Sequence, residues 1–140
     1  MTQLVVAQPG EPERVACVQQ LLAAPALARH PQHWALASGL WLYIDELDRS
    51  HRIAQERDAD ATCNYWHAIM HRREGDFCNS KYWFRRVGKH PAMKTLGPAY
   101  DPFDFVDRVA GAYRQGPTPA ELVDLQRQEW RALFAWCAGR

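Results

Sequence analysis

Apolar residues recur at helical spacing along most of this chain, and proline or glycine interrupts the pattern at short intervals. Val106, Val109, Ala110 and Tyr113 are one such group, and a weaker one lies between Pro12 and Pro25. No stretch shows the alternation of apolar and polar residues that is typical of a strand. Short helices of this kind are stable only when they bury their apolar faces against one another. We therefore expect an all-α fold.

The interruptions predict five to six helices, with two helical hairpins in the middle of the chain and a helix pair at its C-terminal end. Thr62 is a candidate helix cap, Gly75 and Asp76 form the turn of the second hairpin, and a capping box starts at Thr118. The hairpins and the final pair are expected at residues 31–43 with 48–57, 65–73 with 77–87, and 102–113 with 118–137.

The two central hairpins resemble each other when the sequence is shifted by about thirty residues. Small residues in this alignment stand where two helices would cross, and larger ones stand beside them, as close helix packing requires. The corresponding pairs are Ser38 and Ala68, Trp41 and His71, Leu47 and Phe77, Ser50 and Ser80, and Ala54 and Phe84. We therefore expect repeat-like packing of the hairpins, similar to that of tetratricopeptide repeats.

Length and composition predict one domain that spans residues 1–140, with residues 1–11 as a flexible arm. The chain has 47% hydrophobic and 24% charged residues, as ordinary globular proteins do. Its beginning lacks the features of a secretory signal, and no segment has the roughly 18 apolar residues of a membrane span. We expect a cytoplasmic protein without a membrane partner. The cysteines form no C-x-x-C pair and should be free, largely buried thiols.

Charge is segregated along the chain. The net charge is only +1, which argues against nucleic acid as a partner. Residues 62–91, however, contain six lysines or arginines against two acidic residues, together with three of the six histidines. The same segment is rich in aromatic residues, of which Trp66, Trp83 and Phe84 are expected in the core. This segment is therefore the place to look for function.

A metal site is one hypothesis for this segment. On a helix, His67, His71 and Glu74 project from one stripe, because they are spaced by four and three residues. His51 and Asp48 could face them from the preceding hairpin. Imidazole and carboxylate groups from facing helices are ligands for zinc or iron. A divalent transition metal is thus a possible cofactor, and a metal-dependent enzyme is the corresponding function. Without a metal, His71 and Glu74 could form a catalytic acid–base pair.

Binding of an anionic small molecule or protein partner is the leading hypothesis. Arginine pairs flank the Gly75 turn, and their guanidinium groups suit a carboxylate or phosphate unless acidic side chains of the chain itself neutralise them. The expected pocket residues are His67, Arg72, Arg73, Asn79, Tyr82, Arg85 and Arg86. A further alternative is a scaffold whose repeat-like groove accepts a peptide and uses the arginines as a basic rim.

Several long motifs connect the chain to other proteins. They are YWHAIMHRREGDF at residues 65–77, NSKYWFRRVG at 79–88, GLWL at 39–42, LDRSH at 47–51, Asp101-Pro102-Phe103 and Glu129-Trp130-x-x-Leu133-Phe134. With these motifs, which cover most of its length, the chain resembles a bacterial family of small proteins. The resemblance implies one intact domain and no particular reaction or substrate.

Overall fold

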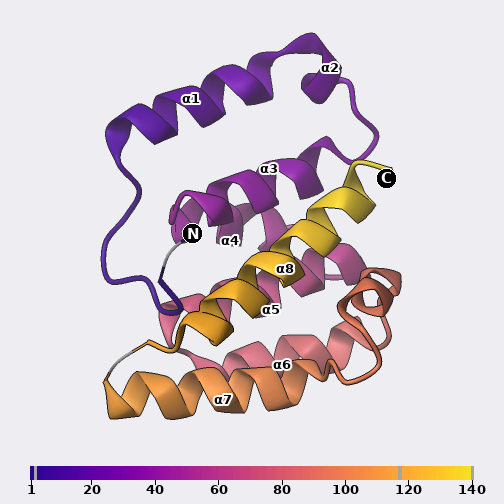
Figure 1. The fold of residues 1–140 in the computed structure, drawn as a ribbon. Coiled ribbons are helices and arrows are strands. Elements are labelled where there is room, and N and C mark those ends of the chain that lie inside the picture. Colours follow the sequence, from indigo (N-terminus) through magenta and orange to yellow (C-terminus); the bar gives the residue numbers. More distant parts are fainter. Residues whose placement is uncertain (2, 117, 140) are drawn as a thin grey trace.

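The computed structural model describes residues 1, 3–116 and 118–139, and within them the chain folds into helices without strands (Figure 1). This confirms the all-α class. The helices are α1 (Pro12–Ala23), α2 (Pro25–Ala28), α3 (His33–Tyr43), α4 (Leu47–Gln55), α5 (Ala61–Glu74), α6 (Phe77–Val87), the 3₁₀ helix η1 (Pro91–Leu96), α7 (Pro102–Gln115) and α8 (Ala120–Cys137). They outnumber the expected five to six partly because α2 and η1 are short segments that begin at prolines. None of these helices has the length and apolar character needed to cross a membrane.

Side-chain caps fix where the central helices begin. The carboxylate of Asp60 accepts hydrogen bonds from the backbone N–H groups of Thr62 and Cys63 at 2.7 and 3.0 Å, so α5 starts one turn before the expected position. Asp60, and not Thr62, is therefore the cap. Asp76 caps α6 in the same way, with a 3.0 Å bond from the N–H of Asn79.

The structure confirms the predicted end of α5 but not the predicted cap of the last helix. Gly75 terminates α5 with a φ of 90°, a left-handed conformation that favours glycine, and its N–H bonds to the carbonyls of the last turn. The capping box expected at Thr118 does not form. Helix α8 has Pro119 at its N-cap position and no side-chain cap there.

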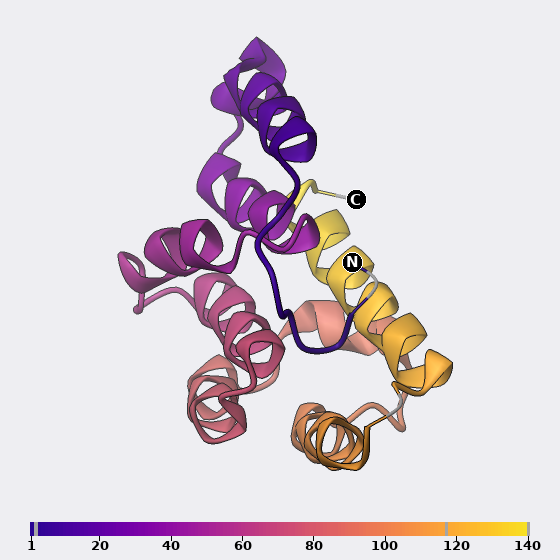
Figure 2. The ribbon, with the colours of Figure 1, turned by 90° about the vertical axis from the view of Figure 1, so that its left-hand side faces the viewer.

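Helix α5 lies at the centre of the molecule. Every residue from Cys63 to Arg73 is buried, and α5 packs against α3, α4 and α6 (Figure 2). Helix α8 crosses in front of α5 in Figure 1 and packs on α3 and η1. A helix that is buried on all sides must find internal partners for each polar side chain it carries. The polar residues of α5 therefore determine much of the architecture.

The two central hairpins cross at corresponding positions. In the first, the hydroxyl oxygens of Ser38 on α3 and Ser50 on α4 lie 2.9 Å apart. In the second, the hydroxyl of Ser80 on α6 donates to the carbonyl of Ala68 on α5 at 2.7 Å. All of these groups are buried. The small residues that were matched in sequence thus stand at the two crossing points.

The N-terminal segment is packed, in contrast to the flexible arm expected for residues 1–11. Met1 and Leu4 are 5% and 3% exposed, and Leu4 belongs to an apolar cluster with residues of α7 and α8. The N–H of Val6 donates to the carbonyl of Arg73 at 2.7 Å. Figure 2 shows this segment passing across the middle of the molecule. Side chains of α5 and α8 also hold the segment, because Arg73 and Gln126 both donate to the carbonyl of Gln3.

All four cysteines are free thiols. Cys63 and Cys137 are buried, as expected, but Cys17 and Cys78 are exposed. Burial raises the pKa of Cys63 well above its usual value and that of Cys137 to about 12. The two buried thiols are thus protonated at neutral pH and are poor nucleophiles.

Two helical glycines provide a matched test of the packing. A Cβ atom on Gly39 of α3 would lie 2.8 Å from a ring carbon of Trp66 and 3.1 Å from one of Phe134, whereas a Cβ on Gly111 of α7 would meet nothing within 4 Å. Gly39→Ala should lower the free energy of unfolding by about 1–3 kcal/mol through overpacking. Gly111→Ala should raise it by up to about 1 kcal/mol through helix propensity. Urea denaturation measures both, and a stabilised Gly39→Ala would contradict this packing.

Candidate functional site

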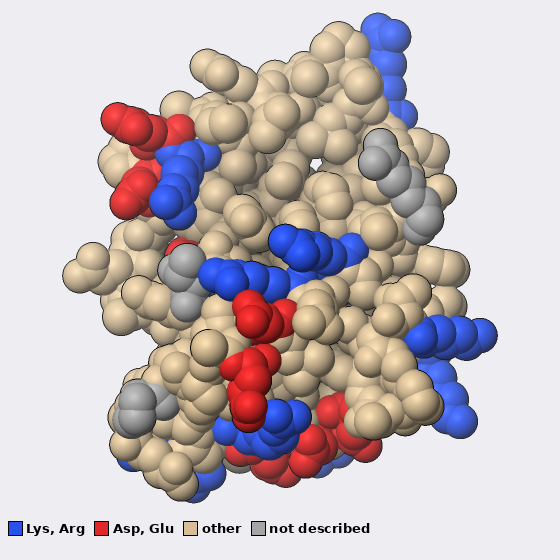
Figure 3. Space-filling view, viewed as in Figure 1, with Lys and Arg blue, Asp and Glu red and all other residues tan. Residues whose placement is uncertain are grey.

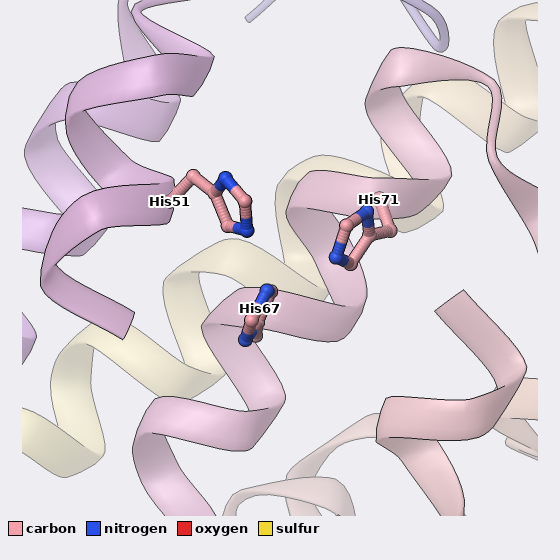
Figure 4. A group of neighbouring side chains, drawn as sticks. All are labelled: His51, His67 and His71. Atoms are coloured by element: carbon pink, nitrogen blue, oxygen red, sulfur yellow. The ribbon is translucent and has the colours of Figure 1, made fainter. Parts of the chain in front are cut away.

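Three imidazoles converge between the two central hairpins. His51 projects from α4, and His67 and His71 project from successive turns of α5 into the same space (Figure 4). One ring nitrogen of each lies within 4.8 Å of those of the other two. The ring centroids are 4.7 Å apart for His51–His67 and His67–His71, and 5.3 Å apart for His51–His71. We call these three residues the histidine cluster.

The central member of the cluster, His67, lacks hydrogen-bond partners. It is 2% exposed, and neither of its ring nitrogens bonds to any group in the described part of the chain. Its ring stacks on that of Trp83, with centroids 3.9 Å apart. A buried polar group without a partner is costly and is uncommon in folded proteins, where an ion or ordered water often accounts for it. His67 is therefore the strongest sign of a ligand at this position.

Burial disfavours protonation of two members of the histidine cluster, His67 and His51. Burial, reinforced by the neighbouring His71 and His51, lowers the pKa of His67 to about 3. Burial and His71 also lower the pKa of His51, although Glu74 and Asp48 oppose this shift. Neutral imidazole is the form that carries a free nitrogen lone pair. The surroundings of His67 and His51 thus favour the metal-binding form of these two side chains.

His71 is held by two polar neighbours. Its Nδ1 forms a short hydrogen bond with the carboxylate of Glu74, one turn further along α5. The amide nitrogen of Asn79, on α6, lies 3.1 Å from its Nε2. In metal sites, a ligand histidine typically donates its second N–H to a carboxylate, which fixes the tautomer. Glu74 is in this position, and its side chain is 39% exposed, so it lies at the boundary between the cluster and solvent.

Arg72 and Arg73 do not line this site. Arg72 is completely buried and forms a two-pronged ion pair with Glu129 of α8, in which one N–O distance is 3.2 Å. Arg73 is also completely buried and bonds to Asp45 and to the carbonyls of Leu42 and Gln3. Buried guanidinium groups require such partners. These two members of the expected anion pocket are therefore neutralised inside the protein.

The other predicted pocket residues point in different directions. Arg85 is exposed, and Arg86 donates to the carbonyl of Asp58 at 2.9 Å while its guanidinium lies over the ring of Trp83. Tyr82 is 47% exposed. Only Asn79 joins His67 and His71 at the cluster. Asp48, considered together with His51, is exposed and is not a member of it.

The sequence analysis missed the contacts of two residues near the site. Trp83 was expected only in the core, but its ring stacks on that of His67. It lies one turn after Asn79 on α6, and this spacing could have indicated that the two side chains point to the same site. Glu129 was not recognised as the partner of Arg72. It stands between Gln126 and Leu133 on the buried stripe of α8, and a carboxylate at such a position indicates a buried cation opposite.

Comparisons of this chain with protein-family models, curated proteins and solved structures found no match. The geometry of the histidine cluster is therefore the basis for inferring function.

The Arg72–Glu129 pair should behave as a structural element. Arg72→Met leaves a buried carboxylate without its cation, so we expect it to lower the free energy of unfolding by about 3–5 kcal/mol. The double variant Arg72→Met/Glu129→Leu should recover part of this loss, because no unpaired charge remains. Chemical denaturation of the four proteins of this cycle measures the coupling. A single variant within about 1 kcal/mol of the wild type would show that the pair does not organise the fold.

The burial of His67 should make stability depend on pH. Below about pH 6 the unfolded chain protonates this imidazole, whereas the folded protein does not until about pH 3, so stability falls as the pH falls through this range. The contribution of His67 is at most about 1.4 kcal/mol per pH unit. His67→Phe should therefore reduce the slope of the free energy of unfolding against pH by up to that amount between pH 6 and 4. An unchanged slope in denaturation experiments would mean that His67 takes up its proton in the folded state.

Proposed function

We propose that this protein binds a divalent transition metal, zinc foremost, through His51, His67 and His71. The observation that carries the proposal is the buried His67, whose two ring nitrogens have no partner within the described chain although two further imidazoles adjoin it. Imidazole nitrogen is a preferred ligand of zinc, iron and related metals. A metal in this space would satisfy one of the two ring nitrogens of His67 that the protein itself leaves unpaired.

The spacing of the three side chains supports such a site. Zinc binds imidazole nitrogen at about 2.0–2.1 Å, which places tetrahedral ligand nitrogens about 3.3 Å apart. The nitrogens of the histidine cluster lie within 4.8 Å of one another, so metal binding requires them to approach by up to about 1.5 Å, which is within the reach of side-chain rotation. His71 would ligate through Nε2, in place of its contact with the amide of Asn79, because its Nδ1 bonds to Glu74.

Three protein ligands leave one coordination position of a tetrahedral metal open. Catalytic zinc sites have this arrangement, and the metal lowers the pKa of a water bound there to about 7. Glu74 is a partly exposed carboxylate next to His71 and could exchange protons with such a water. This combination supports a hydrolytic metal-dependent enzyme over a closed structural site, with Glu74 and His71 as the residues nearest the chemistry.

The anionic ligand expected from the sequence would bind at a different place in this proposal. Because Arg72 and Arg73 are neutralised by internal partners, a carboxylate or phosphate would bind to the open position of the metal.

The similar serine contacts at the two hairpin crossings support tetratricopeptide-like packing of the central helices. In that arrangement the metal lies where the two repeats meet, between α4 and α5.

Metal analysis tests the proposal directly. Protein purified in non-chelating buffer after growth with added zinc should contain about one zinc per chain, and His51→Ala, His67→Ala and His71→Ala should each reduce this content severely. His33→Ala changes an exposed histidine outside the cluster and serves as the matched control. Glu74→Gln should keep the site but weaken metal affinity about 10–100-fold.

Thermal unfolding provides a second measurement. Zinc at one hundred times its Kd should stabilise the wild type by about 2.7 kcal/mol and leave the three cluster variants unchanged. If the wild type neither retains a transition metal nor gains thermal stability from added zinc, iron or nickel, the proposed function is wrong.

A further inference from the structure

A groove on a different part of the molecule has the features of a second ligand site. It has a volume of about 710 Å³ and lies between α1, α3 and α8, in the region where α1 stands apart from α8 in Figure 1. Helix α1 packs on α3, which forms the floor of the groove, so α1 and α8 become its walls. The lining residues are Met1, Arg14, Cys17, Val18, Leu21, Leu40, Tyr43, Ile44, Arg127, Trp130 and Arg131.

The interior of the groove is mostly apolar and is accessible to solvent. Leu21 and Tyr43, which are 48% and 45% exposed, are two of the five large hydrophobic residues that the described chain leaves exposed, and both line it. Trp130 lies against Tyr43, with ring centroids 4.8 Å apart. Clustered exposure of large apolar side chains marks binding sites for apolar groups. A volume of this size is typical of small-molecule pockets, which measure about 300–1,000 Å³.

The charged residues of the groove all have the same sign. Arg14, Arg127 and Arg131 line it, and no acidic residue does. Arg14 pairs at 3.2 Å with the exposed Glu11, which precedes α1, and Arg127 pairs at 3.1 Å with the exposed Asp124 of α8. Arg131 is exposed and has no carboxylate within 4 Å among the described residues. Figure 3 shows basic side chains in the middle of this face, with a broad uncharged surface above them and acidic side chains directly below. The occupant should therefore have a negative head and an apolar body.

We propose that the groove binds a free long-chain carboxylic acid, with its hydrocarbon tail between α1 and α8 and its carboxylate at Arg131. A guanidinium without an internal carboxylate is well suited to a carboxylate, because its N–H donors match the two oxygens. Leu21, Leu40 and Tyr43 contact the tail. The groove does not include the histidine cluster, so this site is independent of the proposed metal site.

Calorimetric titration with octanoate, decanoate and dodecanoate, each below its micelle concentration, tests the proposal. Affinity should rise up to about fourfold per added methylene, because each buried CH₂ contributes a similar free energy. Dodecanol and dodecyltrimethylammonium have the same tail without the negative head, and they should bind at least tenfold more weakly. Equal binding of dodecanol and dodecanoate, or no binding of any acid, would overturn the proposal.

Matched variants locate the ligand. Arg131→Ala should weaken dodecanoate binding about tenfold, and Leu21→Glu, which adds a negative charge to one wall, should abolish it. Both residues are exposed, so circular dichroism and the Tm should remain as in the wild type. Arg85→Ala removes another exposed arginine, far from the groove in sequence, and should bind dodecanoate normally. Loss of binding in Arg85→Ala to the same degree would indicate nonspecific charge attraction and contradict the assignment.

Two further experiments distinguish a fatty-acid site from the proposed metal site and from a membrane contact. His67→Ala should bind dodecanoate as the wild type does, so failure of the metal site and failure of the fatty-acid site can be distinguished. Vesicles of anionic phospholipid should bind much more weakly than the free acid. If the vesicles bind as tightly as dodecanoate, and Leu21→Glu weakens both equally, the groove is a membrane contact and not a fatty-acid site.

Discussion

The buried arginines of helix α5 determine how the other elements are arranged around it. Arg72 and Arg73 are adjacent in sequence, so their side chains leave the helix about 100° apart and reach different parts of the fold. Arg72 bonds to Glu129 of α8, and Arg73 bonds to Asp45 in the α3–α4 turn and to the carbonyl of Gln3. Each cation must have its partner, because an unpaired charge in the interior would cost several kcal/mol. One dipeptide thus links α8, the first hairpin and the N-terminal segment.

This arrangement explains the unusual backbone at Asp45. Its φ of 72° is the one positive value found among the described non-glycine residues, and it lies at the turn where α3 ends. Asparagine and aspartate tolerate this conformation better than most residues do. The ion pair with the buried Arg73 holds the partly buried carboxylate in place and offsets the local strain. Turn geometry and buried charge therefore stabilise each other.

The sequence predicted the all-α class and the central hairpins well, because those features depend on local patterns. The stripe of His67, His71 and Glu74 could likewise be read from helical spacing. What could not be read was which side chains the packing would bury. The basic segment at residues 62–91 indicated an anion pocket, whereas its buried arginines are paired with Glu129 and Asp45, 57 and 28 residues away in sequence. The packing of Leu4 and the groove between α1 and α8 depend on similar long-range contacts.

The two sites that we propose lie in different regions of this small fold. The histidine cluster lies between the hairpins, where burial lowers the pKa of His67 and leaves both of its ring nitrogens unpaired. X-ray absorption spectroscopy of the zinc-loaded protein tests the central claim most directly, because it identifies the atoms bound to the metal. We expect three imidazole nitrogens at about 2.0–2.1 Å, recognised by the additional scattering from their rings, and one oxygen ligand. Sulfur scattering near 2.3 Å, or a shell of oxygen alone, would show that zinc binds elsewhere and would contradict this account.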